Sequence, residues 1–198
     1  MKEPLTGESI VVRPSIDEDL LERKETMVSS LSRDTLVEQL RKHGITFLAG
    51  GEETGETTDL PVDDVITSLV VSEDPRLRLA LIPFFVLHPE TARNVATLVE
   101  RLPATSALDL QTFYTAAVYL QRLWWTRLHF YRKDLPALPD LYSQALGLPP
   151  AEERHGKVGL YTLAAWHTRR SAYPFNRLAS YQKVMDLLFE QLKLEARE

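Results

Sequence analysis

The segment WHTRRSAYPFNR, residues 166–177, gathers side chains that bind anions. Its ionisable residues are His167, Arg169, Arg170 and Arg177. Arginine presents a planar, permanently charged fork of N–H donors that fits a phosphate or a carboxylate. The sequence therefore predicts that this segment binds an anion or a partner. A structural alternative is that Arg169 and Arg170 end a helix, where cations are favoured by the unpaired carbonyl groups.

A second basic feature lies in YTAAVYLQRLWWTRLHFYRK, residues 114–133. At helical spacing, Arg122, His129 and Lys133 fall on the side opposite a broad apolar stripe. We expect Trp124 and Trp125 to be core residues, because a helix this apolar is usually central to its domain. Base stacking would need aromatic rings on the basic side, and most rings lie on the other. The stretch is thus interpreted as a buried helix with a narrow basic stripe for a partner or an anion.

No familiar catalytic pattern accompanies these cations. The histidines include no H-E-x-x-H motif, residues 155–159 lack the spacing of a phosphate-binding loop, and no G-x-S-x-G elbow occurs. The chain has no cysteine, which excludes disulfides and cysteine nucleophiles and is compatible with a cytoplasmic protein. We predict no catalytic residue, no metal site and no cofactor, and a non-catalytic role is favoured over an unrecognised enzyme.

Charge is distributed unevenly along the 198 residues. Residues 1–75 hold 17 acidic and 7 basic side chains, whereas residues 76–198 hold 11 acidic and 16 basic ones. Residues 154–185 hold six Arg or Lys and no acid. This block is expected either to pack against the acidic N-terminal part of the same chain or to face an anionic partner.

Helical patterns dominate the rest of the chain, so we predict a mainly α fold. Helices are expected over 61–71, 74–87, 89–101, 159–170 and from Asn176 onward, around a long central helix near 107–132 opened by a Ser106–Asp109 capping box. At most a short β element is expected near 45–50. The longest nearly uncharged run is interrupted by Arg78 and Pro83, so no membrane span is expected.

The composition also predicts two parts. Residues 1–59 would form an acidic N-terminal appendage, with one helix from Ser15 to Leu31, another capped by Asp34, and a flexible loop rich in Gly, Thr and Glu. Residues 60–198 would form the helical main domain.

The segment DPRLRLALIPFFVLHPETARNVATLVERLP, residues 74–103, resembles one unit of a HEAT-like helical repeat. Asp74, Pro75 and Arg78 match the turn of that unit, and Leu98 and Leu102 fall where its second helix packs. The resemblance implies helical-hairpin packing and a binding role, and it carries no catalytic residues. No second unit is clear in the sequence, although a solenoid needs several stacked units.

These patterns together favour a non-catalytic helical binding or scaffold subunit, in a bacterial multi-component system, that docks a protein partner. The alternative is a nucleic-acid-associated accessory protein that uses the basic residues of the C-terminal half. The nucleic-acid alternative would gain most from a folded surface on which Arg122, Lys133, Arg154, Arg169, Arg170 and Arg177 converge.

Overall fold

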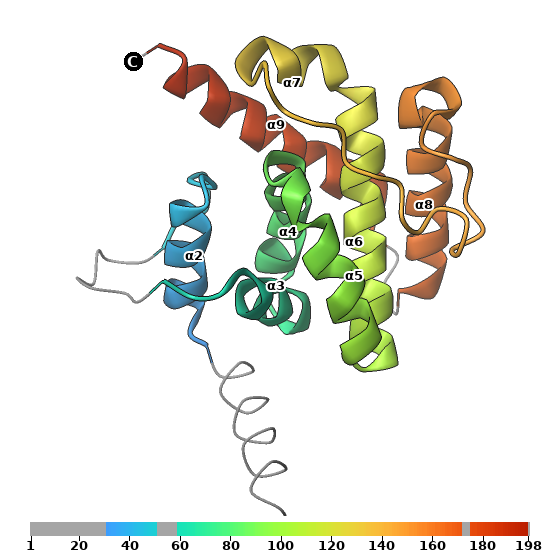
Figure 1. Cartoon of the computed structure of the whole chain (residues 1–198), viewed down its shortest axis with the longest axis horizontal. Coiled ribbons are helices and arrows are strands. Elements are labelled where there is room, and N and C mark those ends of the chain that lie inside the picture. Colours follow the sequence, from blue (N-terminus) through green and yellow to red (C-terminus); the bar gives the residue numbers. More distant parts are fainter. Residues whose placement is uncertain (1–30, 51–58, 172–174, 198) are drawn as a thin grey trace, which may run out of the picture.

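The computed structural model describes residues 31–50, 59–171 and 175–197, and every regular element in these ranges is a helix (Figure 1). The mainly α prediction is therefore confirmed. The α-helices are α2 (Arg33–Lys42), α3 (Val62–Val71), α4 (Pro75–Leu87), α5 (Ala92–Arg101), α6 (Ala104–Leu123), α7 (Trp125–Tyr131), α8 (Lys157–Arg170) and α9 (Arg177–Glu195). The 3-10 helices are η1 (Pro89–Thr91) and η2 (Glu153–Gly156). Within the described ranges, no helix combines the length and apolar character needed to cross a membrane.

Local capping fixes where several helices begin. Asp74 accepts a hydrogen bond from the Arg76 amide at 2.8 Å and so caps α4, while Asn176 accepts one from the Ala179 amide at 3.0 Å and caps α9. The N-cap of α2 is Ser32, whose hydroxyl accepts from the Thr35 amide at 3.1 Å, and not Asp34 as the sequence predicted. A serine two residues earlier provides the same kind of acceptor.

Helix α6 lies at the centre of the fold. Helices α4, α5 and α8 pack against it, and α9 packs against α4 and α8 (Figure 1). Every residue of α6 from Thr112 to Gln121 is buried, and the side chains of Tyr114 and Tyr119 are inaccessible to solvent. Their hydroxyl groups donate to the carbonyl oxygens of Pro139 and Pro149 at 2.9 and 2.6 Å. These bonds hold the segment after α7 along α6.

The predicted continuous helix over 107–132 is wrong at Trp124. This residue has φ −104° and ψ 19°, and α7 leaves in a new direction (Figure 1). The Trp124 indole packs edge-on against Phe189 of α9 at 5.7 Å, and Arg132 pairs with Glu195 of α9 at 3.1 Å. Contacts with α9 thus accompany the break. No glycine or proline marks it in the sequence.

The break also changes the environment of the two tryptophans. Trp124 is partly buried, but Trp125 is 37% exposed and is not the core residue that the sequence predicted. Leu128, one turn later, is completely buried. The apolar stripe therefore continues into α7 at Leu128, while the ring of Trp125 faces the surface.

Two other expectations also need correction. Helix α6 begins at Ala104 after Pro103, so Ser106 and Asp109 lie inside the helix and do not form its capping box. Proline at the N-cap with an extended backbone, φ −52° and ψ 145°, starts the helix earlier. Residues 45–50 form no strand, and Ile45 packs in the core.

The proposed boundary between an appendage and a main domain stays a prediction. The predicted helix from Ser15 and the acidic loop fall mostly on residues 1–30 and 51–58, which lie outside the described residues. Helix α2 packs on α3 and α4, and Leu36, Val37 and Leu40 belong to the same hydrophobic core as the later helices. Gln191 of α9 also accepts from the Thr46 amide at 2.9 Å and donates to the Gly44 carbonyl at 2.8 Å.

Residues 74–103 fold into two consecutive helices, α4 and α5, as the HEAT-like resemblance implies. Both helices make their main contacts with α6 rather than with each other. Asp74 caps α4, and Arg78 pairs with Asp109 of α6. The resemblance therefore describes a local pair of helices that packs on a third.

Candidate functional site

Basic side chains gather at both ends of the α6 and α8 pair. The two helices pack with the start of α6 near the end of α8, and the end of α6 near the start of α8. We call the hollow at the first end the arginine cleft and the hollow at the second end the basic groove. Because α8 has 14 residues, the two ends lie about 20 Å apart along it.

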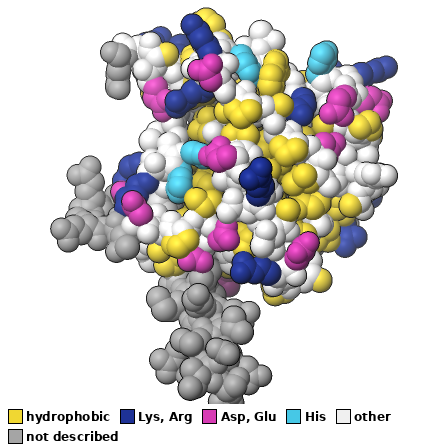
Figure 2. Space-filling view, viewed as in Figure 1, with side chains coloured by type: hydrophobic (Ala, Val, Ile, Leu, Met, Phe, Trp, Pro, Cys, Tyr) yellow, Lys and Arg dark blue, Asp and Glu magenta, His cyan; other side chains and the backbone are white. Residues whose placement is uncertain are grey.

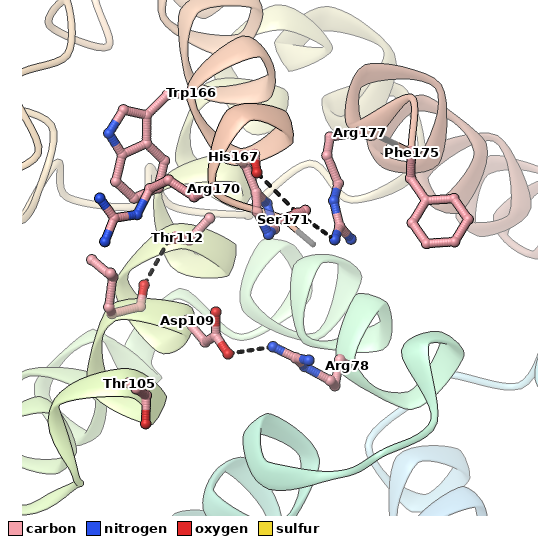
Figure 3. Close-up of a pocket in the computed structure, with 11 residues that line it drawn as sticks. Arg78, Thr105, Asp109, Thr112, Trp166, His167, Arg170, Ser171, Phe175 and Arg177 are labelled. Carbon is pink, nitrogen blue, oxygen red and sulfur yellow. Dashed lines mark hydrogen bonds and ion pairs between the residues drawn. The ribbon is translucent and has the colours of Figure 1, made fainter. Parts of the chain in front are cut away.

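The arginine cleft has a volume of about 360 Å³ and is formed by α4, α6, α8 and the start of α9 (Figure 3). Its chemistry comes from Arg78, Asp109, Trp166, His167, Arg170 and Arg177. These residues span a hundred positions of the chain, so only the packing of α4 and α8 on α6 brings them together.

Arg78 and Asp109 form an ion pair across the α4–α6 contact (Figure 3). The Arg78 guanidinium also lies over the ring of Phe113 at 5.6 Å. Burial raises the pKa of Asp109, and the guanidinium groups of Arg78 and Arg177 oppose that rise. The Nε–H of Arg78 is buried and finds no acceptor among the described residues, so this side chain keeps an unused donor.

Arg177 and Arg170 are held by neutral neighbours. Arg177 donates to the Ser171 hydroxyl at 2.7 Å and lies over the ring of Phe175 at 5.8 Å (Figure 3). Arg170 lies over Trp166 at 5.0 Å. Within the described part of the chain, neither Arg170 nor Arg177 has a carboxylate at ion-pair distance. The Nε–H of Arg177, like that of Arg78, is buried without an acceptor there.

His167 forms the buried wall of the arginine cleft. Its Nδ1 is hydrogen-bonded to the hydroxyl of Tyr181 at 2.5 Å, and Tyr181 is inaccessible to solvent. Burial, together with the positive charges of Arg177 and Arg78, lowers the pKa of His167 to about 4. The ring is therefore neutral at pH 7.

The charge of the arginine cleft does not balance. Among the described residues that line it there are three guanidinium groups, a neutral His167 and one acid, Asp109, which is already paired with Arg78. The cleft thus holds a net positive charge in a partly desolvated hollow, with donors already oriented by rings and a hydroxyl. Such a hollow is suited to a carboxylate or a phosphate.

The basic groove is broader, with a volume of about 710 Å³. It lies between the end of α6, the start of α7 and the turn that precedes α8, and its defining residues are Arg122, Trp125, Ala137, Arg154, His155 and Lys157. No acidic residue lines it among the described residues. Arg122 is fixed there because it donates to the Leu138 carbonyl at 2.9 Å and to the Gln121 side chain at 3.2 Å.

The structure divides the predicted site residues between these two hollows. Arg170 and Arg177 line the arginine cleft, and Arg122 lines the basic groove. His129 stacks behind Trp125 at 3.9 Å and bonds to the Trp125 carbonyl at 3.0 Å. Lys133 and Arg169 are exposed and line neither hollow.

Sequence reasoning did not place Arg78 or Asp109 in a site, and it gave Trp166 no role of its own within the segment 166–177. Arg78 stood out only as part of the helical-repeat turn, and Asp109 only as a capping residue. Their pairing joins residues 31 positions apart and depends on how α4 crosses α6. The one available signal was the excess of basic over acidic residues in the C-terminal half.

The wider surface mixes residue types, with apolar, basic and acidic side chains interspersed on the face in Figure 2. In residues 31–50, 59–171 and 175–197, no three histidine or carboxylate side chains group closely enough to hold a metal ion.

Comparison of the chain with known proteins found no matching family model, no similar curated protein and no similar solved structure.

Proposed function

We propose that the protein is a non-catalytic helical binding subunit that docks a protein partner by holding an acidic side chain or terminal carboxylate of that partner in the arginine cleft. The observation that carries this proposal is the pair Arg170 and Arg177. Both guanidinium groups line one hollow, both lie over aromatic rings, and neither has a carboxylate partner in the described part of the chain.

The energetics favour a partner that brings its own negative charge. A guanidinium group that is partly desolvated without a counter-charge is costly, and an incoming carboxylate offsets that cost with charge-assisted hydrogen bonds. Because Trp166 and Phe175 already orient the two guanidinium groups, less side-chain entropy is lost on binding. His167 adds no charge at pH 7, so the cleft stays selective for anions through its arginines.

A cytoplasmic setting and membership of a multi-component system belong to the same proposal. They rest on the cysteine-free sequence and on the cleft being a binding site rather than a reaction site. Its acid, Asp109, is engaged by Arg78, and its histidine is engaged by Tyr181. Among the described hydrogen bonds, the Ser171 hydroxyl donates to the His167 carbonyl, and no hydroxyl group that lines the cleft is bonded to the His167 imidazole.

The test compares two double variants that remove the same charge. Arg170→Gln with Arg177→Gln changes the cleft, whereas Arg169→Gln with Lys193→Gln removes two exposed cations outside it. Tagged wild-type protein and both variants capture partners from a lysate of the source organism. Captured proteins are then purified and titrated calorimetrically against all three forms, after circular dichroism has verified that each variant is folded.

We expect at least one partner to bind the wild type and the exposed-cation variant equally and the cleft variant at least about tenfold more weakly, a loss of ~1.4 kcal/mol. A partner whose affinity is unchanged in the cleft variant would contradict the proposal. The nucleic-acid alternative is measured separately by mobility shift with generic DNA and RNA. A log–log salt slope of about −0.9 for each phosphate contact would favour it, whereas a protein partner should show a shallower dependence.

A further inference from the structure

The basic groove is a second concentration of charge, separate from the arginine cleft. Arg122 reaches it from the end of α6, and Arg154, His155 and Lys157 reach it from the turn that starts α8. Among the described residues, no ion pair involves Arg122, Arg154 or Lys157. Cations from two distant segments of the chain therefore face one hollow without a counter-charge in its lining.

The turn that carries these cations is unfavourable in two respects. Arg154 and His155 both have left-handed backbones, with φ of 47° and 54°, which costs about 1–2 kcal/mol for each residue with a side chain. In addition, the first turn of α8 contains no acid, and Lys157 stands where the helix dipole disfavours a cation. Local rules broken together at one place are typical of a functional site.

The frame around the basic groove is rigid. Gly156 and Gly159 press the start of α8 onto Tyr119 of α6, and a side chain at either position would collide with that residue. The Gln121 amide donates to the Pro136 carbonyl at 3.1 Å and its oxygen accepts from the Leu138 amide at 2.7 Å. Arg122 and the turn are therefore held in fixed positions across the groove.

The size and charge of the basic groove select the ligand class. Arg122, Arg154 and Lys157, with no acid among the described lining residues, favour an anion with several charges, and a volume of about 710 Å³ falls within the range of small-molecule sites. Trp125, 37% exposed, adds an apolar surface at one side. We infer that the basic groove binds a polyphosphate chain of two or more linked phosphates, either free or as part of a nucleotide.

The site is independent of the proposed partner contact, because it shares no lining residue with the arginine cleft. The test is titration calorimetry on the full chain, with tripolyphosphate, ATP, adenosine and orthophosphate as probes. The buffer is free of magnesium and contains 150 mM NaCl, which is about physiological ionic strength. We expect tripolyphosphate or ATP to bind at least about tenfold more tightly than orthophosphate, and adenosine not to bind. Equal affinity for tripolyphosphate and ATP would show that the free polyphosphate is sufficient for binding, whereas tighter binding of ATP would identify a nucleotide as the ligand. Failure of both to bind, or orthophosphate binding as tightly as either, overturns the inference.

Variants localise the binding. Arg154→Asn with Lys157→Gln removes two charges from the basic groove, and asparagine tolerates the left-handed backbone, so the turn is preserved. Lys133→Gln with Arg169→Gln removes the same charge from exposed positions outside both hollows. We expect the first pair to lower the tripolyphosphate affinity at least about tenfold and the second to change it less than about twofold. An equal loss in both pairs would mean unspecific charge attraction and would overturn the assignment.

Discussion

The arginine cleft and the basic groove lie at opposite ends of the same helix pair, yet the cations in the two hollows differ in how firmly neighbouring groups hold them. In the cleft, each arginine has a neighbour that fixes it: Asp109 for Arg78, Ser171 for Arg177 and Trp166 for Arg170. In the groove, Arg154 is exposed on the left-handed turn and Lys157 is exposed in the first turn of α8, whereas Arg122 is fixed by hydrogen bonds. Cation content alone therefore does not define a binding mode.

Burial accounts for the contrast. Arg78 and Arg177 of the cleft are partly buried, although Arg170 is exposed, so the interactions of these two side chains are stronger and less screened by salt than those of an exposed cation. In the groove Arg122 is partly buried, but Arg154 and Lys157 are exposed, so attraction of an anion there should weaken more as ionic strength rises.

The largest effect is expected where α8 meets α6. Gly156 has φ 76°, and a Cβ there would meet the backbone of Tyr119. Gly156→Ala combines left-handed strain with overpacking and should lower the free energy of unfolding by about 3–5 kcal/mol. Gly147→Ala is the matched control, because Gly147 also has a positive φ, 66°, with no atom near the added carbon. It should cost only about 1–2 kcal/mol. Urea unfolding measures both, and equal costs would contradict the close packing.

The next effect belongs to the arginine cleft and depends on pH. The folded state holds the pKa of His167 at about 4, below the value of about 6.5 in an unfolded chain. Below pH 6.5 the unfolded state binds this proton more readily, so the free energy of unfolding should fall as the pH decreases toward 4. The loss should approach about 3 kcal/mol, at 1.36 kcal/mol for each pKa unit.

His167→Gln isolates this contribution, because glutamine does not titrate and its amide offers both a donor and an acceptor to the Tyr181 hydroxyl. Carboxylates titrate in the same range, so the measured quantity is the difference between wild type and variant in urea unfolding at pH 7, 6, 5 and 4. The wild type should lose more stability than the variant between pH 6.5 and 4. Parallel curves would mean that His167 is not held neutral by the fold.

Much of the fold was predictable because periodicity and capping act locally. In α9, the helical spacing of Tyr181, Met185, Leu188 and Leu192 predicts an apolar stripe, and all four residues are buried. The predicted cap at Asn176 is also present. The end of α6 was not predictable. Nothing local in residues 121–128 stops a helix, and the contact of Trp124 with Phe189 becomes visible only after α9 has packed.

The candidate site was predictable only in composition. The basic and aromatic composition of residues 166–177 indicates Arg170 and Arg177, and it equally indicates Arg169, which is exposed and does not line the cleft. Their separation from Arg122 could not be foreseen, because it depends on the antiparallel packing of α6 and α8. The ion pair between Arg78 and Asp109 could not be predicted either, because it depends on how α4 crosses α6.

A moderate effect should follow from removing the acid of the arginine cleft. Asp109 competes with any incoming anion for Arg78, so Asp109→Asn should raise the affinity for sulfate by about fivefold, close to 1 kcal/mol after screening by solvent. Sulfate-dependent thermal stabilisation measures this change. Asp186→Asn, on an exposed position of α9, removes the same charge and should leave the sulfate response unchanged. A similar gain in both variants would assign the effect to overall charge.

The smallest effect separates stability from binding in the basic groove. The left-handed backbone of Arg154 is strained, and Arg154→Gly removes that strain. Because the added glycine also increases the conformational entropy of the unfolded chain, the free energy of unfolding should rise by only about 0.5–1 kcal/mol. The same substitution removes one cation and should weaken tripolyphosphate binding by about fivefold. Lys157→Gln should weaken binding without the gain in stability, because Lys157 has a helical backbone with φ −62°. Sulfate binding in the arginine cleft should not change in either variant. If Arg154→Gly destabilises the protein, the turn is not strained, and the case for a functional reason behind its geometry is lost.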